Sequence, residues 1–175
     1  MTDIRVNLRK TEDKSYSIFI EDGLLSHIAA KIKEAGLGHK FAIITDSNVE
    51  PLYAKDLSEA FSKNDLSNKI ISFPAGEENK NREIKSWIED QMLEGKFGRD
   101  SAVIALGGGV VGDIAGYVAA SYTRGLPYVQ IPTTLVACVD SSIGGKTAVD
   151  TPHGKNLIGA FHQPWAVFID VNTLL

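Results

Sequence analysis

Cysteine is almost missing from this sequence: Cys138 is the single cysteine among 175 residues. A disulfide within the chain is therefore impossible, which favours a protein of the reducing cytoplasm. Long apolar runs are missing too, since none approaches the ~20 residues of a membrane-spanning helix. Residues 1–10 are charged and alternating, without the apolar core of a signal peptide. We therefore expect a cytoplasmic protein without a membrane partner.

An excess of positive charge is also missing. Lysine and arginine number 18 against 22 aspartates and glutamates, which gives a net charge of -4. A general nucleic-acid binder would show the opposite balance, so we expect no nucleic-acid partner. A small anionic ligand remains compatible with this charge, because basic residues can cluster locally on an acidic protein. The length fits a single domain over residues 1–175.

Sequence signatures of metal binding and of an activated serine are not found. There is no HExxH motif, no Cys/His cluster and no GxSxG turn. The four histidines are scattered along the chain, at His27, His39, His153 and His162. We therefore predict no metal ligands in this chain.

Apolar strands alternate with amphipathic helices over most of the sequence. Residues 4–8 and 15–20 alternate polar and apolar side chains, which predicts an N-terminal β-hairpin, and a helix is expected at 23–34. The following pattern predicts strands at 41–45, 69–73, 101–106, 128–131 and 166–169, with helices near 49–62, 81–94 and 110–121. This order is typical of an α/β fold with a Rossmann-like, largely parallel sheet flanked by helices.

The strongest local motif lies between a predicted strand and a predicted helix. Gly107, Gly109 and Gly112 have the GxGxxG spacing. Glycines allow the backbone to approach a phosphate closely, and a helix N-terminus attracts the anion. The alternative is a glycine-rich turn without a ligand, but the strand and helix context favours phosphate binding.

Polar residues follow several predicted strands, where the carboxyl ends of a parallel sheet bind ligands. They are Asp46, residues 76–80, residues 107–113, Thr133 and Thr134. The usual acid about 20 residues after the glycine motif is not found, so Asp46 is the candidate for a ribose contact. Asp46 serves equally well as a helix N-cap. Thr133 and Thr134 can cap a helix or bind a cofactor.

Three basic residues and one asparagine gather in the glycine-containing segment from 124 to 156. Arg124, Lys146, Lys155 and Asn156 fall within 33 residues, which suits phosphate or carboxylate recognition. A solvated loop with scattered charge is the alternative. A P-loop is rejected, because the position that requires its first glycine is Asp140.

Four motifs in this order resemble the sugar-phosphate cyclases, and most closely the 3-dehydroquinate synthase family. They are Gly107–Asp113, Ile131–Thr134, Asp140–Thr147 and Gly154–Pro164. Asp150, where asparagine is expected in many members, is a small departure.

The resemblance implies an NAD-dependent lyase of the shikimate pathway, which leads to aromatic amino acids. Its members convert 3-deoxy-arabino-heptulosonate 7-phosphate to 3-dehydroquinate and phosphate. Transient oxidation of one hydroxyl acidifies a neighbouring C–H, so phosphate can leave; hydride return and an aldol closure follow. The family also implies a homodimer and one divalent metal, zinc or cobalt, whose ligands are not in this chain.

The resemblance also assigns roles to residues of this sequence. It implies catalytic or substrate contacts by Arg124, Asp140, Lys146 and Asn156, with Arg124 reaching the phosphate across a dimer interface. It implies cofactor contacts by Asp46, Gly76, Glu77, Lys80, Gly108, Gly109, Val110, Val111, Gly112, Asp113, Thr133, Thr134, Lys146, Lys155 and Thr173.

Family members are about twice as long, and a helical C-terminal domain, absent here, supplies their metal ligands. We therefore expect a chain that binds NAD weakly and is inactive alone. Three alternatives stay open: another sugar-phosphate cyclase, a metal-dependent alcohol or glycerol dehydrogenase of the same fold, and a non-catalytic NAD-binding or assembly module.

Overall fold

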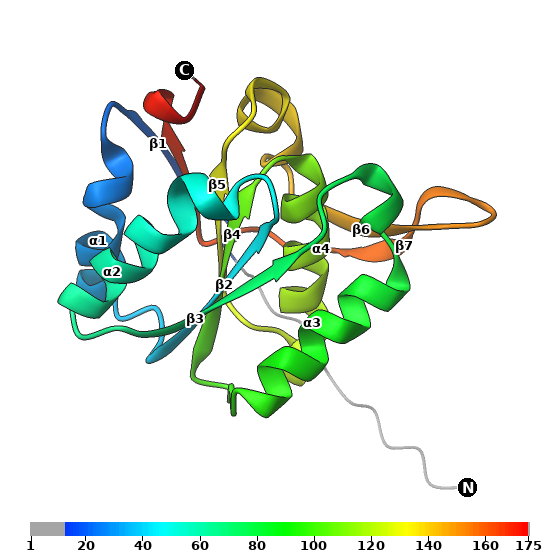
Figure 1. The fold of residues 1–175 in the computed structure, drawn as a ribbon, viewed down its shortest axis with the longest axis horizontal. Helices are drawn as coiled ribbons and strands as arrows, with labels where there is room; N and C mark the ends of the chain where they lie inside the picture. Colours follow the sequence, from blue (N-terminus) through cyan, green and yellow to red (C-terminus); the bar gives the residue numbers. More distant parts are fainter. Residues whose placement is uncertain (1–12, 175) are drawn as a thin grey trace, which may run out of the picture.

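A six-stranded parallel sheet forms the centre of the molecule (Figure 1), which is known from a computed structural model that describes residues 13–174. The strand order is β1-β8-β5-β4-β2-β3, and every neighbouring pair is parallel. The strands are β1 (Ser17–Glu21), β2 (Lys40–Asp46), β3 (Ser67–Phe73), β4 (Ser101–Gly107), β5 (Tyr128–Pro132) and β8 (Ala166–Asp170). The predicted parallel sheet is confirmed.

Helices cover both faces of this sheet. The helices α1 (Ile28–Ala35) and α2 (Lys55–Lys63) lie on one face, and α3 (Arg82–Glu94) and α4 (Gly109–Ser121) lie on the other (Figure 1). The central strand β4 is buried throughout and divides its side chains between two cores. Val103 packs with the α3/α4 core, whereas Ile104 packs with the α1/α2 core. Its continuous apolar run follows from this double coverage.

A second, two-stranded antiparallel sheet was not predicted. It consists of β6 (Lys146–Thr151) and β7 (Gly154–Phe161), which form a hairpin beside α4 (Figure 1). A Cβ on Gly116 of α4 would stand only 2.4 Å from the Thr147 side chain, so this glycine lets the hairpin lie against the helix. The region around Lys146 and Asn156, for which a solvated loop was the alternative interpretation, is therefore a β-hairpin.

The N-terminal predictions have mixed outcomes. The strand expected at 15–20 is observed as β1, but it pairs in parallel with β8. Its expected hairpin partner, residues 4–8, lies outside the described residues. The helix expected at 23–34 is divided into a 3-10 turn, Leu24–Ser26, and α1.

Other short turns precede or follow the main elements. The helix expected at 49–62 begins as a π-helical turn, Glu50–Ala54, before α2. Similar short turns are Glu77–Asn79 after β3, Tyr122–Arg124 after α4, Ala137–Ser141 after β5 and Val171–Leu174 after β8. Most of them stand at the carboxyl edge of the sheet, where the candidate ligand residues were predicted.

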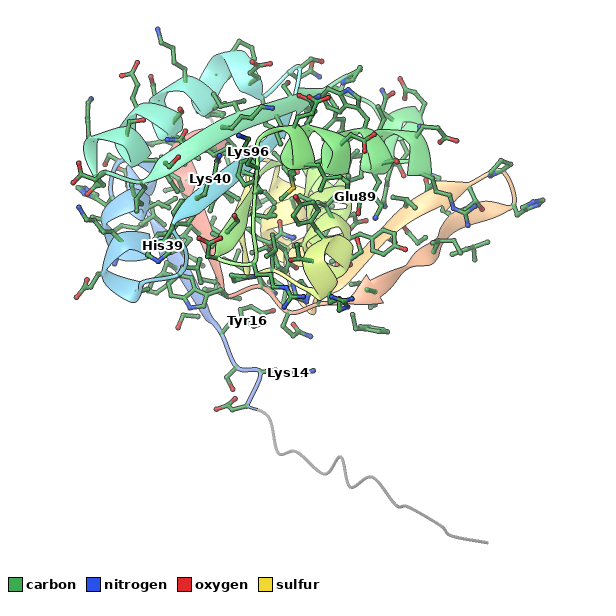
Figure 2. The ribbon with its side chains drawn as sticks, turned by 90° about the horizontal axis from the view of Figure 1, so that it is seen from below. Lys14, Tyr16, His39, Lys40, Glu89 and Lys96 are labelled. Atoms are coloured by element: carbon green, nitrogen blue, oxygen red, sulfur yellow. The ribbon has the colours of Figure 1, made fainter. Side chains whose placement is uncertain are left out.

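Figure 2 views the molecule from below, toward the edge of the sheet where the amino ends of the strands lie. There Lys40 donates to the carbonyl oxygen of Gly95 at 2.5 Å and lies over the ring of Phe97, 4.8 Å from its centroid. The His39 amide donates to the Asp100 carbonyl. Within the described part of the chain, no helix is long and apolar enough to cross a membrane.

Candidate nucleotide and anion site

The glycine motif forms a tight turn from β4 into α4, as predicted. Gly107 ends the strand, Gly108 is the N-cap residue and Gly109 begins the helix. No side chain in the described part of the chain caps this helix start. Its first backbone amides therefore remain available to a bound anion, and the helix dipole favours negative charge there.

Neighbouring residues leave little space for side chains on this turn. A Cβ on Gly108 would lie 3.2 Å from the Thr134 side chain, and one on Gly109 would lie 3.1 Å from Ser141 Oγ. The Thr133 amide also donates to the Gly107 carbonyl at 3.0 Å. The glycine motif, β5 and the turn after β5 thus form one continuous surface, and a side chain at Gly108 or Gly109 would require Thr134 or Ser141 to move.

The two threonines after β5 have different environments. Thr134 Oγ1 accepts a hydrogen bond from the Ala137 amide at 3.3 Å, so its predicted capping role is confirmed. Thr133 Oγ1 is buried and has no hydrogen-bond partner among residues 13–174. Burying a hydroxyl group without a partner is costly. Thr133 therefore has an unused hydrogen-bonding group beside the glycine motif, as its predicted cofactor contact requires.

Four predicted site residues line one cleft of about 470 Å³ between α4 and the β6–β7 hairpin. Asp113 comes from α4, Asp140 from the turn after β5, Lys146 from β6 and Asn156 from β7. Their positions span 44 residues of sequence, yet the hairpin brings them together. The cleft combines carboxylate, ammonium and amide groups, which can bind a polar anionic ligand and move a proton.

Lys80 is buried and connects three segments of the site. It forms an ion pair with Asp113 of α4, and its Nζ donates to Asn156 Oδ1 at 2.6 Å. Burial raises the pKa of the Asp113 carboxyl, and the neighbouring Lys80 opposes this rise. The ion pair offsets the free-energy cost of burying the Lys80 ammonium group away from water.

A second, exposed ion pair joins the turn after β3 to the hairpin. Lys155 Nζ lies 2.9 Å from Glu77 Oε1, and this hydrogen bond raises the pKa of Lys155. Both residues line a larger cleft of about 980 Å³ next to the first one. Gly76 begins the turn at a φ of 121°, which residues other than glycine rarely adopt. Glu77 and Lys80 thus reach the hairpin from one short turn.

Two predicted cofactor residues lie at the same sheet edge but are already engaged locally. Asp46 Oδ1 accepts hydrogen bonds from the amides of Asn48 and Val49, at 2.9 and 3.0 Å. The local capping role that the sequence allowed is therefore present, and the ribose contact stays a prediction. Thr173 follows β8, where its Oγ1 donates to the Asp170 carbonyl at 2.8 Å.

The fold places Arg124 away from the cleft. It lies just beyond the C-terminal end of α4, whose N-terminal end carries the glycine motif. Thirteen helical residues separate the two ends, roughly 20 Å at 1.5 Å per residue. Arg124 has a positive φ of 72° and an exposed side chain. Its predicted contact across a dimer interface stays a prediction.

Sequence reasoning missed the residues that hold the site residues in place. Asp150 Oδ1 accepts the Asn156 amide at 2.8 Å and thereby supports a φ of 57° at Asn156. Asp170 is buried and accepts the amides of Gly23, Leu25 and Asn172. The turn residues between 150 and 154, flanked by alternating side chains, were a usable hairpin signal.

Residues 13–174 contain no group of three or more histidine, cysteine, aspartate or glutamate side chains that could hold a metal ion. These residues therefore do not fit the divalent metal that the sequence resemblance implies, and no step of the chemistry is assigned to a metal here.

The fold is similar to that of solved structures of sugar-phosphate cyclases. A 2-deoxy-scyllo-inosose synthase complexed with carbaglucose-6-phosphate, NAD+ and Co2+ matches with a TM-score of 0.83 and 30% identity, over 90% of this chain and 43% of that one. The valiolone synthase ValA of Streptomyces hygroscopicus subsp. jinggangensis, with NAD+ and Zn2+ bound, matches with a TM-score of 0.82 and 33% identity, over 97% and 46%.

The family follows from the sequence match. The family model described as 3-dehydroquinate synthase N-terminal matches residues 70–175, so the chain belongs to this family. The 3-dehydroquinate synthase of Geobacter metallireducens is 49% identical over 162 residues, which are 93% of this chain and 45% of that protein. The chain spans about half the length of the curated relatives it matches.

Proposed function

We propose that this chain is the NAD-binding half of a 3-dehydroquinate synthase. The complete enzyme would convert 3-deoxy-arabino-heptulosonate 7-phosphate to 3-dehydroquinate and phosphate in the cytoplasm. Because the chain spans about half of its curated relatives, we expect it to bind NAD and a phosphate-bearing ligand without completing the reaction. A homodimer, with Arg124 acting across its interface, is part of this proposal.

The observation that carries the proposal is that the start of α4, which follows the glycine turn, lies beside the hairpin that bears Lys146 and Asn156. The N-terminus of α4, which no side chain of the described residues caps, suits a pyrophosphate, and the close neighbours of Gly108 and Gly109 favour glycine there. Lys146 and Asn156 line the adjacent cleft and suit the oxygens of a phosphate. A dinucleotide and a sugar phosphate would therefore lie side by side.

Bound NAD would supply the reversible hydride transfer that makes the substrate acidic. The residues of this chain would orient the substrate beside it. Lys146 and Asn156 would hold the phosphate, and Asp140, across the same cleft, would accept a hydrogen bond from a substrate hydroxyl. Asp113 is paired with Lys80, which makes it a structural partner of the cofactor site rather than a free base.

Calorimetric titration of NAD into the chain tests the cofactor site. We expect saturable binding that weakens about tenfold in Asp46→Asn, which corresponds to about 1.4 kcal/mol. The asparagine oxygen can still accept the Asn48 and Val49 amides, so the turn is kept while the charged ribose acceptor is lost. Lys33→Met, in an exposed ion pair with Asp65, is the matched control and should bind NAD normally. Absence of saturable binding would contradict the cofactor assignment.

The second half of the Geobacter metallireducens relative, added with NAD and zinc, tests the reaction itself. We expect phosphate release from 3-deoxy-arabino-heptulosonate 7-phosphate. If NAD binds but no phosphate is released, the chain is better described as a non-catalytic NAD-binding or assembly module.

Another sugar-phosphate cyclase activity is a second candidate, and the similarity to the inosose and valiolone synthases supports it. The same reconstituted protein, offered other sugar phosphates, distinguishes them by the substrate that releases phosphate. Accumulation of NADH with glycerol would instead favour a dehydrogenase.

A further inference from the structure

Lys80 lies between the two ligand sites of the proposed function. The backbone around it belongs to the turn after β3, its ammonium group pairs with Asp113 near the start of α4, and it donates to Asn156 on the hairpin. A further bond ties the same residue to the hairpin, since its carbonyl oxygen accepts the Asp150 amide at 2.7 Å. Lys80 is therefore the point at which the cofactor side and the anion side of the site are joined.

The contact with Lys80 fixes which way the Asn156 amide faces. An ammonium group only donates, so the oxygen of the Asn156 side chain must face Lys80, as observed at 2.6 Å. The amide nitrogen is then left for another acceptor. The backbone N–H of Asn156 donates a hydrogen bond to Asp150 Oδ1 at 2.8 Å. Asn156 is thus held at its backbone and at its side-chain oxygen, and its side-chain NH₂ group remains as a donor.

Lys80 also retains a donor for a ligand. An ammonium group has three N–H bonds, and the described residues provide two acceptors, Asp113 and Asn156. A ligand oxygen on the cofactor side can take the third. Such a bond would hold the lysine more firmly, and this would in turn hold the Asn156 amide in its donating orientation.

We propose that Lys80 is a positioning residue that couples cofactor binding to anion binding by orienting the Asn156 amide as a donor to the anion. The proposal rests on the proposed function, because it takes NAD as the cofactor-side ligand. Coupling of this kind is reciprocal: NAD must tighten phosphate binding by the same factor by which phosphate tightens NAD binding. A purely structural lysine would stabilise the fold without producing such a factor.

Titrations of inorganic phosphate, with and without saturating NAD, measure the coupling. In the unaltered chain we expect NAD to tighten phosphate binding by about fivefold or more, within the usual range for coupled sites. In Lys80→Met the factor should fall to about one, while Lys33→Met should keep the original value. An unchanged coupling factor in Lys80→Met would overturn the proposal.

Two further measurements remain decisive if Lys80→Met does not fold or if NAD does not bind. Asn156→Asp keeps an acceptor for Lys80 but replaces the amide donor by a negative charge, so the chain should lose at least about tenfold in phosphate affinity. In the unaltered chain, the side-chain NH₂ resonances of Asn156 should shift when phosphate is added. Resonances that do not respond, or normal phosphate affinity in Asn156→Asp, would refute the orientation of the amide. Failure of NAD binding would refute the proposed function and the coupling with it, whereas the resonance shift tests the orientation of the Asn156 side-chain amide separately.

Discussion

Removal of Lys80 should destabilise the protein in a way that depends on pH. Lys80→Met leaves the Asp113 carboxylate, whose side chain is 17% exposed, without its cation. Breaking a buried ion pair from one side costs about 3–5 kcal/mol, and we expect about 3 kcal/mol at neutral pH because Asp113 keeps some contact with water. This is less than the 5–15 kcal/mol that stabilises a typical domain, so the variant should fold.

The sign of the pH dependence follows from Asp113. Burial already raises the pKa of this carboxyl, and Lys80 opposes the rise. Without Lys80 the pKa rises further, so the folded state keeps a proton at pH values where the unfolded chain has lost it. Stability contributed by such a group is lost as the pH rises through the folded pKa. The deficit of Lys80→Met should therefore be largest near pH 7.5 and smaller near pH 5.

Urea denaturation of both proteins at the two pH values measures this difference. The double variant Lys80→Met/Asp113→Asn removes both charges, so it should regain most of the stability and lose the additional pH dependence. Lys33→Met breaks an exposed pair and should cost less than about 1 kcal/mol at either pH. A deficit that stays constant or grows toward pH 5 would refute the reasoning.

Three other changes test local features of the fold. Gly116→Ala should lower the midpoint of thermal unfolding, because its Cβ would stand 2.4 Å from the Thr147 side chain and overpacking of about 1–3 kcal/mol exceeds the roughly 1 kcal/mol gained in helix propensity; an unchanged midpoint would mean that the hairpin moves freely. Asn81→Ala removes the acceptor of the Ile84 amide at the start of α3 and should cost about 1 kcal/mol in urea denaturation, whereas Asn81→Asp should not. Cys138 is buried, and burial raises its pKa, so a thiol reagent should label it slowly at pH 7 and rapidly in denaturant; rapid labelling of the folded chain would contradict its position.

Most of the sheet could be predicted because its signals are local. The apolar strand 101–106 is flanked by a turn and a glycine run, and it is observed as β4, Ser101–Gly107. The β6–β7 hairpin was missed because it forms a separate antiparallel sheet against α4, outside the alternation of strands and helices that predicted the main sheet. The hairpin packs closely beside Gly116, a contact that no local pattern encodes.

The amino-acid sequence by itself determined the α/β class, the glycine turn at the start of α4 and the family, because these depend on residue order and spacing. The tertiary structure alone decided which side chains meet. It paired Lys80 with Asp113 and Asn156, and it left Arg124 at the far end of α4. The physical reason is that ion pairs and clefts depend on distances between segments remote in sequence, and these distances exist only once the hairpin has packed against the helix.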